Sequence, residues 1–325
     1  MTRAITYGEA IREGMAELMA ADDRVYVLGE DVGAYGGVFG ITKGLMERFG
    51  EERVRSTPLS ENGILGEAIG AALAGLRPIA EIQFSDFITP AMSPLVDLAA
   101  TYHWRLGTSV PIVVRMPSGG GLRAGNFHSK SLEAWFFHTP GLKIVVPSTP
   151  ADAKGLLVSS LRDSDPVLFM EHKKLYYEIS GDVPVGLYEV PLGEASIVRP
   201  GNQITLVTYG AMVHLALKAA KALEGEGIDL EVIDLRTLAP LDEETLLKSF
   251  RKTGRLIVLH EAPLRGGVGG ELASLVCEKA FDSLAAPPIR IGAAFTPIPV
   301  PPDLEDAYLP SVEQVTAAAR RLAQY

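Results

Sequence analysis

The sequence contains very little cysteine and no cluster of basic residues. Its one cysteine, Cys277, excludes a disulfide within the chain. Lys and Arg number 30 against 40 Asp and Glu, which gives a formal net charge of -10. Proteins that bind nucleic acid present clustered Lys and Arg to the phosphates. The charge balance therefore argues against a nucleic-acid partner.

Long apolar runs are also missing. No stretch reaches the roughly eighteen consecutive apolar residues that a membrane span needs. The N-terminal segment follows a helical apolar period and includes acidic residues, whereas a secretory signal peptide has a basic start and an apolar centre. We therefore expect a globular protein without membrane contact, located in the reducing cytoplasm.

Short apolar runs typical of buried strands alternate with helical patterns in the first half of the chain. The apolar fraction of 47% over 325 residues is enough for two domains with large cores. Strands that are separated by helices normally pair in parallel. We therefore predict an α/β fold with a parallel sheet, whose strands fall at residues 25–28, 79–84, 112–115, 143–146 and 167–170.

A stretch rich in Pro and Gly, without helical period, runs from about residue 180 to residue 201. We interpret it as a connection between domains. Beyond it, strands are expected at residues 204–210, 230–236, 255–261 and 288–294, with helices at 211–223, 243–253 and 270–281. The predicted domains are residues 1–186 and a smaller α/β domain, residues 187–325.

Residues 57–87 comprise a polar turn, a helix built largely from Gly and Ala, and a strand. Gly66, Gly70 and Ala74 share one face of this helix. Small residues let another backbone approach closely, so we expect a subunit interface there. Glu61 begins the helix behind Ser60. Taken alone, Ser60 is an N-cap and Glu61 a solvated acid that the helix dipole favours.

Glu61 followed by Gly66 and Gly70 is also similar to the pyrimidine-binding signature of thiamine-diphosphate enzymes. In its order of motifs, and over nearly its whole length, the chain resembles the β subunits of the E1 components of 2-oxoacid dehydrogenases. Among these, the β subunits of the branched-chain and pyruvate enzymes have the most similar motif sequences. The motifs are LGEDVGAYGGVFGITKGL, TPLSENG, AEIQFSDF, VRMPSGGGLRAGNFHSKSLEAWFFHTPGLKIVVP, DLRTLAPLD and HEAPLRGGVGGELAS.

This resemblance implies a transketolase-like fold, in which a pyrimidine-binding domain is followed by a smaller transketolase-type C-terminal domain. In the family, the carboxylate at the position of Glu61 hydrogen-bonds N1′ of the aminopyrimidine of thiamine diphosphate. It thereby helps the 4′ nitrogen to take the proton from thiazolium C2. Gln83 would offer the same ring a polar contact, and Phe87 would stack on it. Taken alone, Phe87 is a core residue.

His128 follows GGGLRAGNF, a Gly-rich loop of mobile character that precedes an aromatic-rich helix. In the family, the histidine of this loop lies at the mouth of the active site. It is thought to donate a proton when the acyl group passes to the lipoyl group of E2, a step that suits an imidazole. Lys130 stands where the family more often has Gln, a departure on the substrate side that leaves the histidine in place. His138 is expected to be structural.

Glu30 ends a predicted strand, at a place where loops of parallel sheets commonly build sites. Taken alone it is a buried charge or an interface ion pair, and we place it near the cofactor without a stated role. Many family members also bind a structural potassium ion through backbone carbonyls. The matching positions here are Val110, Ile112, Leu161, Asp163 and Asp165.

The metal-binding half of a thiamine-diphosphate site is missing from the sequence. Single-chain enzymes of this kind use Gly-Asp-Gly and a later Asn to hold Mg2+ and the diphosphate, and no Gly-Asp-Gly occurs here. The nearest string, at residues 181–183, lies in the domain connection. The resemblance therefore implies an E1 α subunit that holds Mg2+ in an α2β2 heterotetramer. It also implies a 2-oxoacid substrate and a lipoylated E2 as the acyl acceptor.

A second glycine-rich stretch, RGGVGGE at residues 265–271, opens a predicted helix. Such a helix start can bind an anion. We interpret it instead as close packing in a domain that organises subunit contacts in the family. Phe295 departs from the Asp that the family often has before Thr-Pro, which loosens assignment to one subfamily.

Two alternative functions stay open. The β subunits of acetoin dehydrogenase are closely similar, but they usually carry a longer insertion after GEDV that this chain lacks. The other alternative is a noncatalytic scaffolding subunit. The presence of both Glu61 and His128 argues against it, because packing alone would accept other residues. A nucleotide-binding dehydrogenase is disfavoured, because the glycines of GAYGGVFG do not fit the GxGxxG spacing.

Overall fold

The computed structural model describes residues 2–325, which divide into two compact units. The first contains residues up to 118 together with Trp135–Leu192, and the second contains Gly119–Ala134 and Gly193–Tyr325. The chain thus divides after residue 192, whereas the sequence suggested 186. The segment Gly119–Ala134 was expected in the first domain but belongs to the second unit, because its hydrogen bonds are made there.

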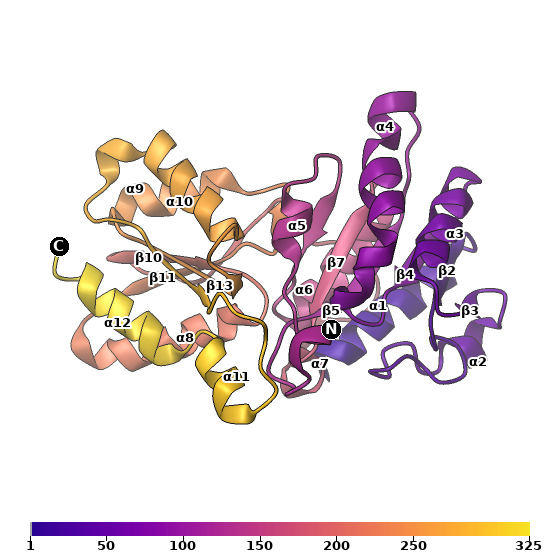
Figure 1. The fold of residues 1–325 in the computed structure, drawn as a ribbon, viewed down its shortest axis with the longest axis horizontal. Helices are drawn as coiled ribbons and strands as arrows, with labels where there is room; N and C mark the ends of the chain where they lie inside the picture. The colour runs from indigo at the N-terminus through magenta and orange to yellow at the C-terminus, as the bar shows by residue number, and fades with distance from the viewer. Residues whose placement is uncertain (1) are drawn as a thin grey trace. The chain divides into compact units, whose positions relative to one another are not determined.

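A parallel sheet forms the centre of the first unit (Figure 1). Within this unit the strands follow the order β6-β7-β5-β4-β2-β3, and each pairs in parallel with its neighbours. All residues of β2, β5 and β7 are buried, as a parallel sheet with both faces covered requires. The predicted parallel sheet is confirmed. Its strands are β2 (Val25–Gly29), β3 (Val54–Ser56), β4 (Arg77–Glu81), β5 (Val113–Ser118), β6 (Lys143–Val145) and β7 (Val167–His172).

The N-terminal segment begins with a strand that the helical pattern did not predict. This strand, β1 (Thr2–Thr6), pairs antiparallel with β8 (Ser180–Pro184). Thr6 then caps the first helix, since its Oγ1 accepts from the backbone N–H of Glu9 at 3.2 Å and the Glu9 carboxylate accepts from Thr6 N at 2.8 Å. The helices that follow are α1 (Tyr7–Ala21), α2 (Leu45–Phe49), α3 (Glu61–Leu73), α4 (Ala100–Leu106), α5 (Glu133–Phe137), α6 (Pro150–Arg162) and α7 (Leu175–Glu178).

Helix α1 packs against α6 around a buried lysine. Lys154 of α6 has a fully buried side chain, and its ammonium group forms ion pairs with Glu13 at 2.7 Å and Glu17 at 2.9 Å. Gly14 lies opposite, where an added Cβ would be 3.5 Å from the Lys154 side chain. This ion-pair cluster fixes the two helices side by side.

Arg115 is a fully buried arginine that joins three strands of the first sheet. It lies on β5, and its Nε and Nη2 donate to the two carboxylate oxygens of Glu171 on β7 at 2.5 and 2.6 Å. Its Nη1 donates to the carboxylate of Glu81 on β4. The Tyr176 hydroxyl completes the cluster by donating to Glu171 at 2.6 Å. Strands β4, β5 and β7 are therefore tied together toward their carboxyl ends.

The second unit has its own sheet, in the order β14-β13-β10-β11-β9, with β9 antiparallel to β11. No helix among residues 2–325 is long and apolar enough to cross a membrane. The strands of this sheet are β9 (Ser196–Arg199), β10 (Ile204–Thr208), β11 (Leu230–Asp234), β13 (Leu256–Pro263) and β14 (Ile289–Ala293), and the short strand β12 (Thr237–Ala239) of the same unit lies outside it. The helices are α8 (Met212–Leu223), α9 (Glu243–Thr253), α10 (Val268–Lys279), α11 (Pro302–Tyr308) and α12 (Val312–Leu322).

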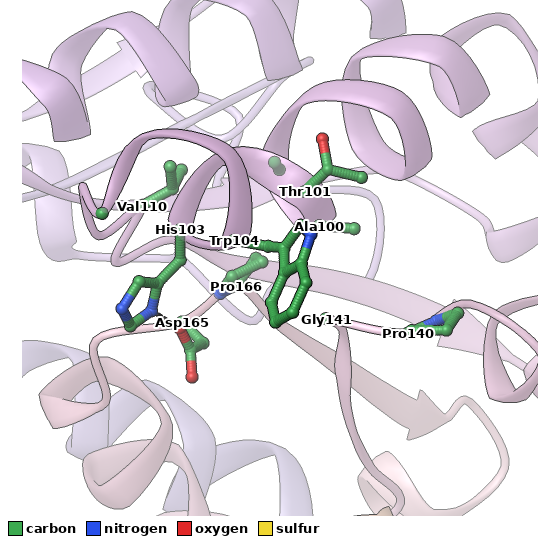
Figure 2. Close-up of a pocket in the computed structure, with 11 residues that line it drawn as sticks. Ala100, Thr101, His103, Trp104, Val110, Pro140, Gly141, Asp165 and Pro166 are labelled. Carbon is green, nitrogen blue, oxygen red and sulfur yellow. Dashed lines mark hydrogen bonds and ion pairs between the residues drawn. The ribbon is translucent and has the colours of Figure 1, made fainter.

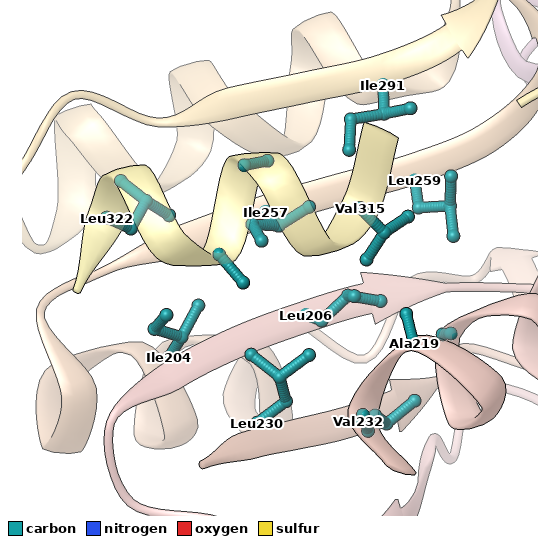
Figure 3. Packing of buried hydrophobic residues seen from close by; sticks show 14 of the residues in the cluster. Ile204, Leu206, Ala219, Leu230, Val232, Ile257, Leu259, Ile291, Val315 and Leu322 are labelled. Carbon is teal, nitrogen blue, oxygen red and sulfur yellow. The ribbon is translucent and has the colours of Figure 1, made fainter. Parts of the chain in front are cut away.

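Helices α8 and α12 cover one face of this second sheet and enclose an apolar core, to which Leu206, Leu259, Ala219 and Val315 contribute (Figure 3). Helix α9 lies on the other face, where the Thr205 hydroxyl is 2.7 Å from that of Ser249. Its bounds agree with the predicted helix at residues 243–253, because its amphipathic pattern and its Asp242 N-cap mark both the face and the start.

Candidate active site

The polar turn before α3 places Glu61 at the first position of the helix. Ser60 is the N-cap, and its Oγ accepts from the backbone N–H of Gly63 at 3.3 Å. Glu61 is half-buried. Its carboxylate thus lies at the positive end of the helix dipole, which stabilises negative charge. The capping interpretation is confirmed, and it is compatible with a functional role for Glu61.

A second carboxyl group, that of Glu30, lies in the same electrostatic environment as Glu61. Glu30 directly follows β2, is only 6% exposed, and has one carboxylate oxygen without a hydrogen-bond partner. Burial raises the pKa of Glu30, and the charges of Glu61 and Asp31 raise it further, while the backbone N–H of Ser60 opposes this. The structure therefore provides two neighbouring carboxyls, of which Glu30 holds a proton more firmly than an ordinary glutamate.

Asp31 and Gln83 form a hydrogen bond beside this carboxyl pair. The Gln83 amide donates to the Asp31 carboxylate at 3.1 Å. Asp31 adopts a φ of 58°, an uncommon conformation for a residue with a side chain, and such conformations occur often at functional sites. The sequence placed Gln83 within a strand at residues 79–84. Strand β4 instead ends at Glu81, so Gln83 lies in the loop that follows the strand.

Phe87 belongs to a cluster of aromatic rings that follows β4. It lies in a 3₁₀ segment, Ser85–Ala91, and is half-buried. Its ring centroid is 5.4 Å from that of Phe84, which in turn lies 5.4 Å from that of Phe39. Both pairs meet edge to face, a favoured arrangement. Phe87 is therefore held by packing, and its stacking on a pyrimidine stays a prediction.

Three segments thus bring Glu30, Glu61, Gln83 and Phe87 to the first unit's candidate site. Two of them follow the carboxyl ends of the parallel strands β2 and β4, where open α/β sheets commonly bind ligands. The third is the start of α3. Carboxyl, amide and aromatic groups together suit a flat heterocycle with ring nitrogens.

His128 lies in the second unit, at the end of a short 3₁₀ turn, Gly125–Phe127. Its backbone N–H donates to the carbonyl of Gly125 at 3.2 Å, and its side chain is half-buried. Phe127 beside it is 69% exposed, and the Lys130 ammonium lies 5.8 Å from the centre of its ring. A partly exposed imidazole in this position can reach solvent or a ligand, and its proton-donor role stays a prediction.

A pocket of about 700 Å³ lies elsewhere in the first unit (Figure 2). Helix α4 contributes His103 and Trp104 to its wall, and the His103 ring nitrogen is 3.0 Å from the Asp165 carboxylate. Asp165 precedes β7 and Val110 precedes β5, so the pocket lies at the amino ends of the strands. It is therefore at the opposite edge of the sheet from Glu30 and Gln83, and we do not assign the reaction to it.

The carbonyls expected to bind potassium lie at this amino edge as well. The guanidinium of Arg77 donates to the carbonyl of Leu161 at 2.5 Å and to that of Asp163 at 3.3 Å. The carbonyl of Ile112 accepts from a strand N–H. Lys143 contacts the Asp163 carboxylate at 2.6 Å. The carbonyl oxygens of Leu161 and Asp163 come together, as those of a potassium site must, but both accept from Arg77. Potassium stays a prediction.

The glycine-rich stretch at residues 265–271 is explained by His260. This histidine is fully buried on β13, where burial lowers its pKa to about 4. An added Cβ on Gly267 or Gly269 would lie 2.8 or 2.7 Å from its ring. Gly267 precedes α10, so the helix can approach β13 closely only because these positions lack side chains. The interpretation as close packing agrees with this geometry.

Comparison with protein families identifies both parts of the chain. Residues 3–178 match the transketolase pyrimidine-binding domain, and residues 193–315 match the transketolase C-terminal domain. A solved structure described as a split-gene transketolase, an inactive β4 tetramer, superimposes with a TM-score of 0.77 at 22% identity over 98% of both chains. The chain is thus a transketolase-type protein with a pyrimidine-binding and a C-terminal domain.

Curated relatives narrow this class. The 2-oxoisovalerate dehydrogenase subunit beta of Bacillus subtilis (strain 168) is 48% identical over 324 residues, 99% of each chain. The pyruvate dehydrogenase E1 component subunit beta of Acholeplasma laidlawii is 45% identical over 98% of each chain. The acetoin:2,6-dichlorophenolindophenol oxidoreductase subunit beta of Cupriavidus necator is 45% identical, over 99% of this chain and 98% of its own. The chain belongs to the family of E1 β subunits of 2-oxoacid dehydrogenases.

The raised pKa of Glu30 predicts a pH-dependent gain in stability for Glu30→Gln. A carboxyl whose pKa is higher in the folded than in the unfolded chain destabilises the fold when it ionises. This penalty is absent below the unfolded pKa, near 4.5, and is complete above the folded pKa. Glu30→Gln should therefore raise the melting temperature at neutral pH, by an amount that shrinks toward acidic pH. Thermal unfolding of the isolated chain across this range measures it.

The matched control is Glu52→Gln, because the Glu52 side chain is 95% exposed. It should leave the melting temperature nearly unchanged at every pH. A Glu30→Gln variant that is less stable than the wild type at neutral pH would contradict the assignment.

Proposed function

We propose that this chain is the β subunit of an E1 enzyme that decarboxylates a 2-oxoacid, pyruvate or a branched-chain acid, and passes the acyl group to a lipoylated E2. The observation that carries the proposal is Glu61 at the start of α3, next to Glu30, whose pKa is raised by burial. The cytoplasm remains the proposed compartment. Family membership supports the reaction type, and the substrate is left to experiment.

Thiamine diphosphate, when bound, supplies the electron sink for decarboxylation. Glu61 would exchange a proton with N1′ of the aminopyrimidine. Burial, and after it the neighbouring charges of Glu61 and Asp31, raise the pKa of Glu30, so a carboxyl that takes up a proton more readily than an ordinary glutamate lies next to Glu61. Gln83, which is hydrogen-bonded to Asp31, would offer a polar contact to the ring, and Phe87 its aromatic face.

The same helix supports a partner subunit. Gly66 and Gly70 are exposed on α3, and an added Cβ on either would meet nothing within 4 Å in this chain. Ala74 is exposed as well, whereas Ile64, Ala68 and other residues of the opposite side are buried. We propose that an E1 α subunit packs on this small-residue face, in an α2β2 heterotetramer. The α subunit would supply the Mg2+ that holds the diphosphate.

Acetoin dehydrogenase is the second candidate, favoured by relatives that are as similar as the pyruvate enzymes. The acetoin relatives from Cupriavidus necator and Bacillus subtilis are both 45% identical. Their alignments span 333 and 336 positions, more than the 325 residues of this chain, as insertions in the relatives would produce. This difference in length favours a 2-oxoacid substrate. Assays of the complex with pyruvate, 4-methyl-2-oxopentanoate and acetoin decide between the two.

The role of Glu61 predicts that Glu61→Gln, produced with the α subunit, assembles but decarboxylates at least about 10²-fold more slowly. The amide has the same shape but cannot exchange the proton. Decarboxylation is measured with an artificial electron acceptor in the presence of thiamine diphosphate and Mg2+. Glu67→Gln is the control, because Glu67 lies on the same helix and its carboxylate meets Arg55 at the surface. Substantial turnover by Glu61→Gln would remove Glu61 from this role.

The role of His128 predicts that His128→Ala slows acyl transfer to lipoyl-E2 by about 10²-fold and leaves decarboxylation nearly unchanged. Only the transfer step needs the imidazole proton. The two rates are measured with lipoylated E2 and with an artificial electron acceptor. His138→Ala is the control, since His138 is an exposed histidine outside the loop. Equal losses in both assays would count against the proton-donor role.

We also propose that potassium binds at the amino edge of the first sheet, near the carbonyls of Leu161 and Asp163 that accept hydrogen bonds from Arg77. An ion that binds only the folded chain raises the melting temperature as its concentration rises. The melting temperature should therefore be higher in potassium chloride than in choline chloride or sodium chloride at equal ionic strength. Identical melting curves in the three salts would exclude the site.

A further inference from the structure

The loop that carries His128 has glycines at positions whose backbone conformation requires them. Gly119, Gly121 and Gly125 have φ values of 86°, 87° and 69°, in a region that residues with side chains avoid. Arg123 adopts a φ of 60° even though it has a side chain. The loop is therefore folded into a specific shape that turns several of its N–H groups to one side.

Two buried carboxylates accept these N–H groups. Gly120 N donates to Glu261 Oε1 at 2.7 Å, while Gly121 N donates to Glu305 Oε1 at 3.0 Å. Arg123 N donates to the other oxygen of Glu305 at 3.1 Å. Glu305 is fully buried and Glu261 is 8% exposed. Successive N–H groups that surround an anion form a nest, and here the anion is the protein's own side chain.

Arg123 adds charge to this arrangement. Its Nη1 donates to Glu305 Oε2 at 3.0 Å, and its Nη2 lies 2.7 Å from the carboxylate of Asp306. A buried carboxylate is costly unless it is paired and hydrogen-bonded. The loop conformation therefore stabilises the buried charge of Glu305, and the Glu305 carboxylate in turn stabilises the loop conformation.

The far end of the loop is fixed in the same unit. Ser131 Oγ donates to Glu261 Oε1 at 3.1 Å, and the Tyr209 hydroxyl donates to Glu133 at 2.8 Å. Gly119 N donates to the carbonyl of Lys130 at 3.0 Å and closes the base of the loop. His128 lies between these two anchored ends.

We propose that Glu305 is a positioning residue for His128, which acts by holding the loop from α11. The inference rests on the proposed function of His128 in acyl transfer. Transfer needs the imidazole in a defined place at the dithiolane, and a displacement of about 1 Å can cost about 10²-fold in rate. Decarboxylation does not use this histidine, so it does not depend on the loop position.

The test uses Glu305→Gln in the complete complex with the α subunit, thiamine diphosphate and Mg2+. The amide NH2 that replaces one carboxylate oxygen cannot accept, so Gly121 N and the Arg123 groups lose part of their partners. Amide hydrogen exchange in residues 119–127 should become faster. Transfer to lipoyl-E2 should fall about 10-fold or more, with decarboxylation unchanged within about two-fold.

Asp306→Asn is the matched control. Its side chain is 64% exposed and, within residues 2–325, contacts the Arg123 side chain and not a backbone N–H of the loop. Exchange and transfer should both stay at the wild-type level. Glu305→Asp keeps the charge and both acceptor oxygens, so it should restore transfer toward the wild-type rate. If the Glu305→Gln protein does not fold, Arg123→Ala takes its place, because it removes the charged hydrogen bond to Glu305 from the loop side and should likewise speed exchange and slow transfer.

Three outcomes would overturn the proposal: unchanged exchange, faster exchange with unchanged transfer, or equal losses of transfer and decarboxylation. His128→Ala separates this failure from a failure of the proposed function. If His128→Ala itself does not affect transfer selectively, the role of His128 is wrong. The exchange experiment then still tests whether Glu305 holds the loop.

Discussion

Arg115, between Glu81 and Glu171, is the interaction on which the candidate site depends. Removing one partner of such a buried ion pair typically costs about 3–5 kcal/mol, because the other charge is left buried and unpaired. The cluster holds the carboxyl ends of β4, β5 and β7 in register. Gln83 and the following aromatic segment begin two residues beyond Glu81. Their position is therefore set by an interaction that contains none of the residues assigned to the cofactor.

Tyr176 extends this cluster toward the aromatic side of the site. Its hydroxyl donates to Glu171, and its ring centroid lies 5.4 Å from that of Phe39. Phe39 packs against Phe84, and Phe84 against Phe87. A continuous path of aromatic contacts thus runs from the central ion pairs through half-buried rings to the ring that is expected to stack on the pyrimidine. Each contact is weak, but together they leave Phe87 few alternative positions.

The acidic side chains of this protein differ in how fully their oxygens are satisfied. Glu81 and Glu171 are paired with Arg115, and Glu305 accepts three hydrogen bonds from one loop. Glu30, in contrast, has a buried oxygen without a partner and a raised pKa. Incomplete satisfaction is unfavourable for folding and useful for proton exchange. This contrast points to the functional site better than cavity size does, since the 700 Å³ pocket lies at the other edge of the sheet.

Much of the fold could be predicted from the sequence, because the strands of a buried parallel sheet consist of consecutive apolar residues. Helix α9 could be placed to the residue, since its amphipathic pattern and its cap coincide. Strands β1 and β8 were missed, because they depend on pairing between distant segments and β8 is partly exposed. The capping pattern of Thr6 and Glu9 could have shown where α1 begins.

The candidate site could be predicted only where a residue belongs to a motif. Glu61 and His128 were proposed as site residues in this way, whereas Arg115, Glu261 and Glu305 carried no such signal. Their partners lie far away in the sequence: 184 residues separate Gly121 from Glu305. The Gly-rich loop was interpreted as mobile because composition cannot distinguish a flexible glycine from one that a positive φ requires. Its membership of the second unit follows from those distant partners.

Helix α3 would keep the proposed split cofactor site well ordered. One end of the helix presents Glu61, and the exposed small-residue face of Gly66 and Gly70 lies within the next two to three turns. A helix is stiff over this length, so a partner that packs on the face is fixed in distance from the carboxylate. In the proposed heterotetramer, the subunit that holds the diphosphate would thereby be placed correctly for the pyrimidine. Assembly and catalytic geometry would then depend on the same helix.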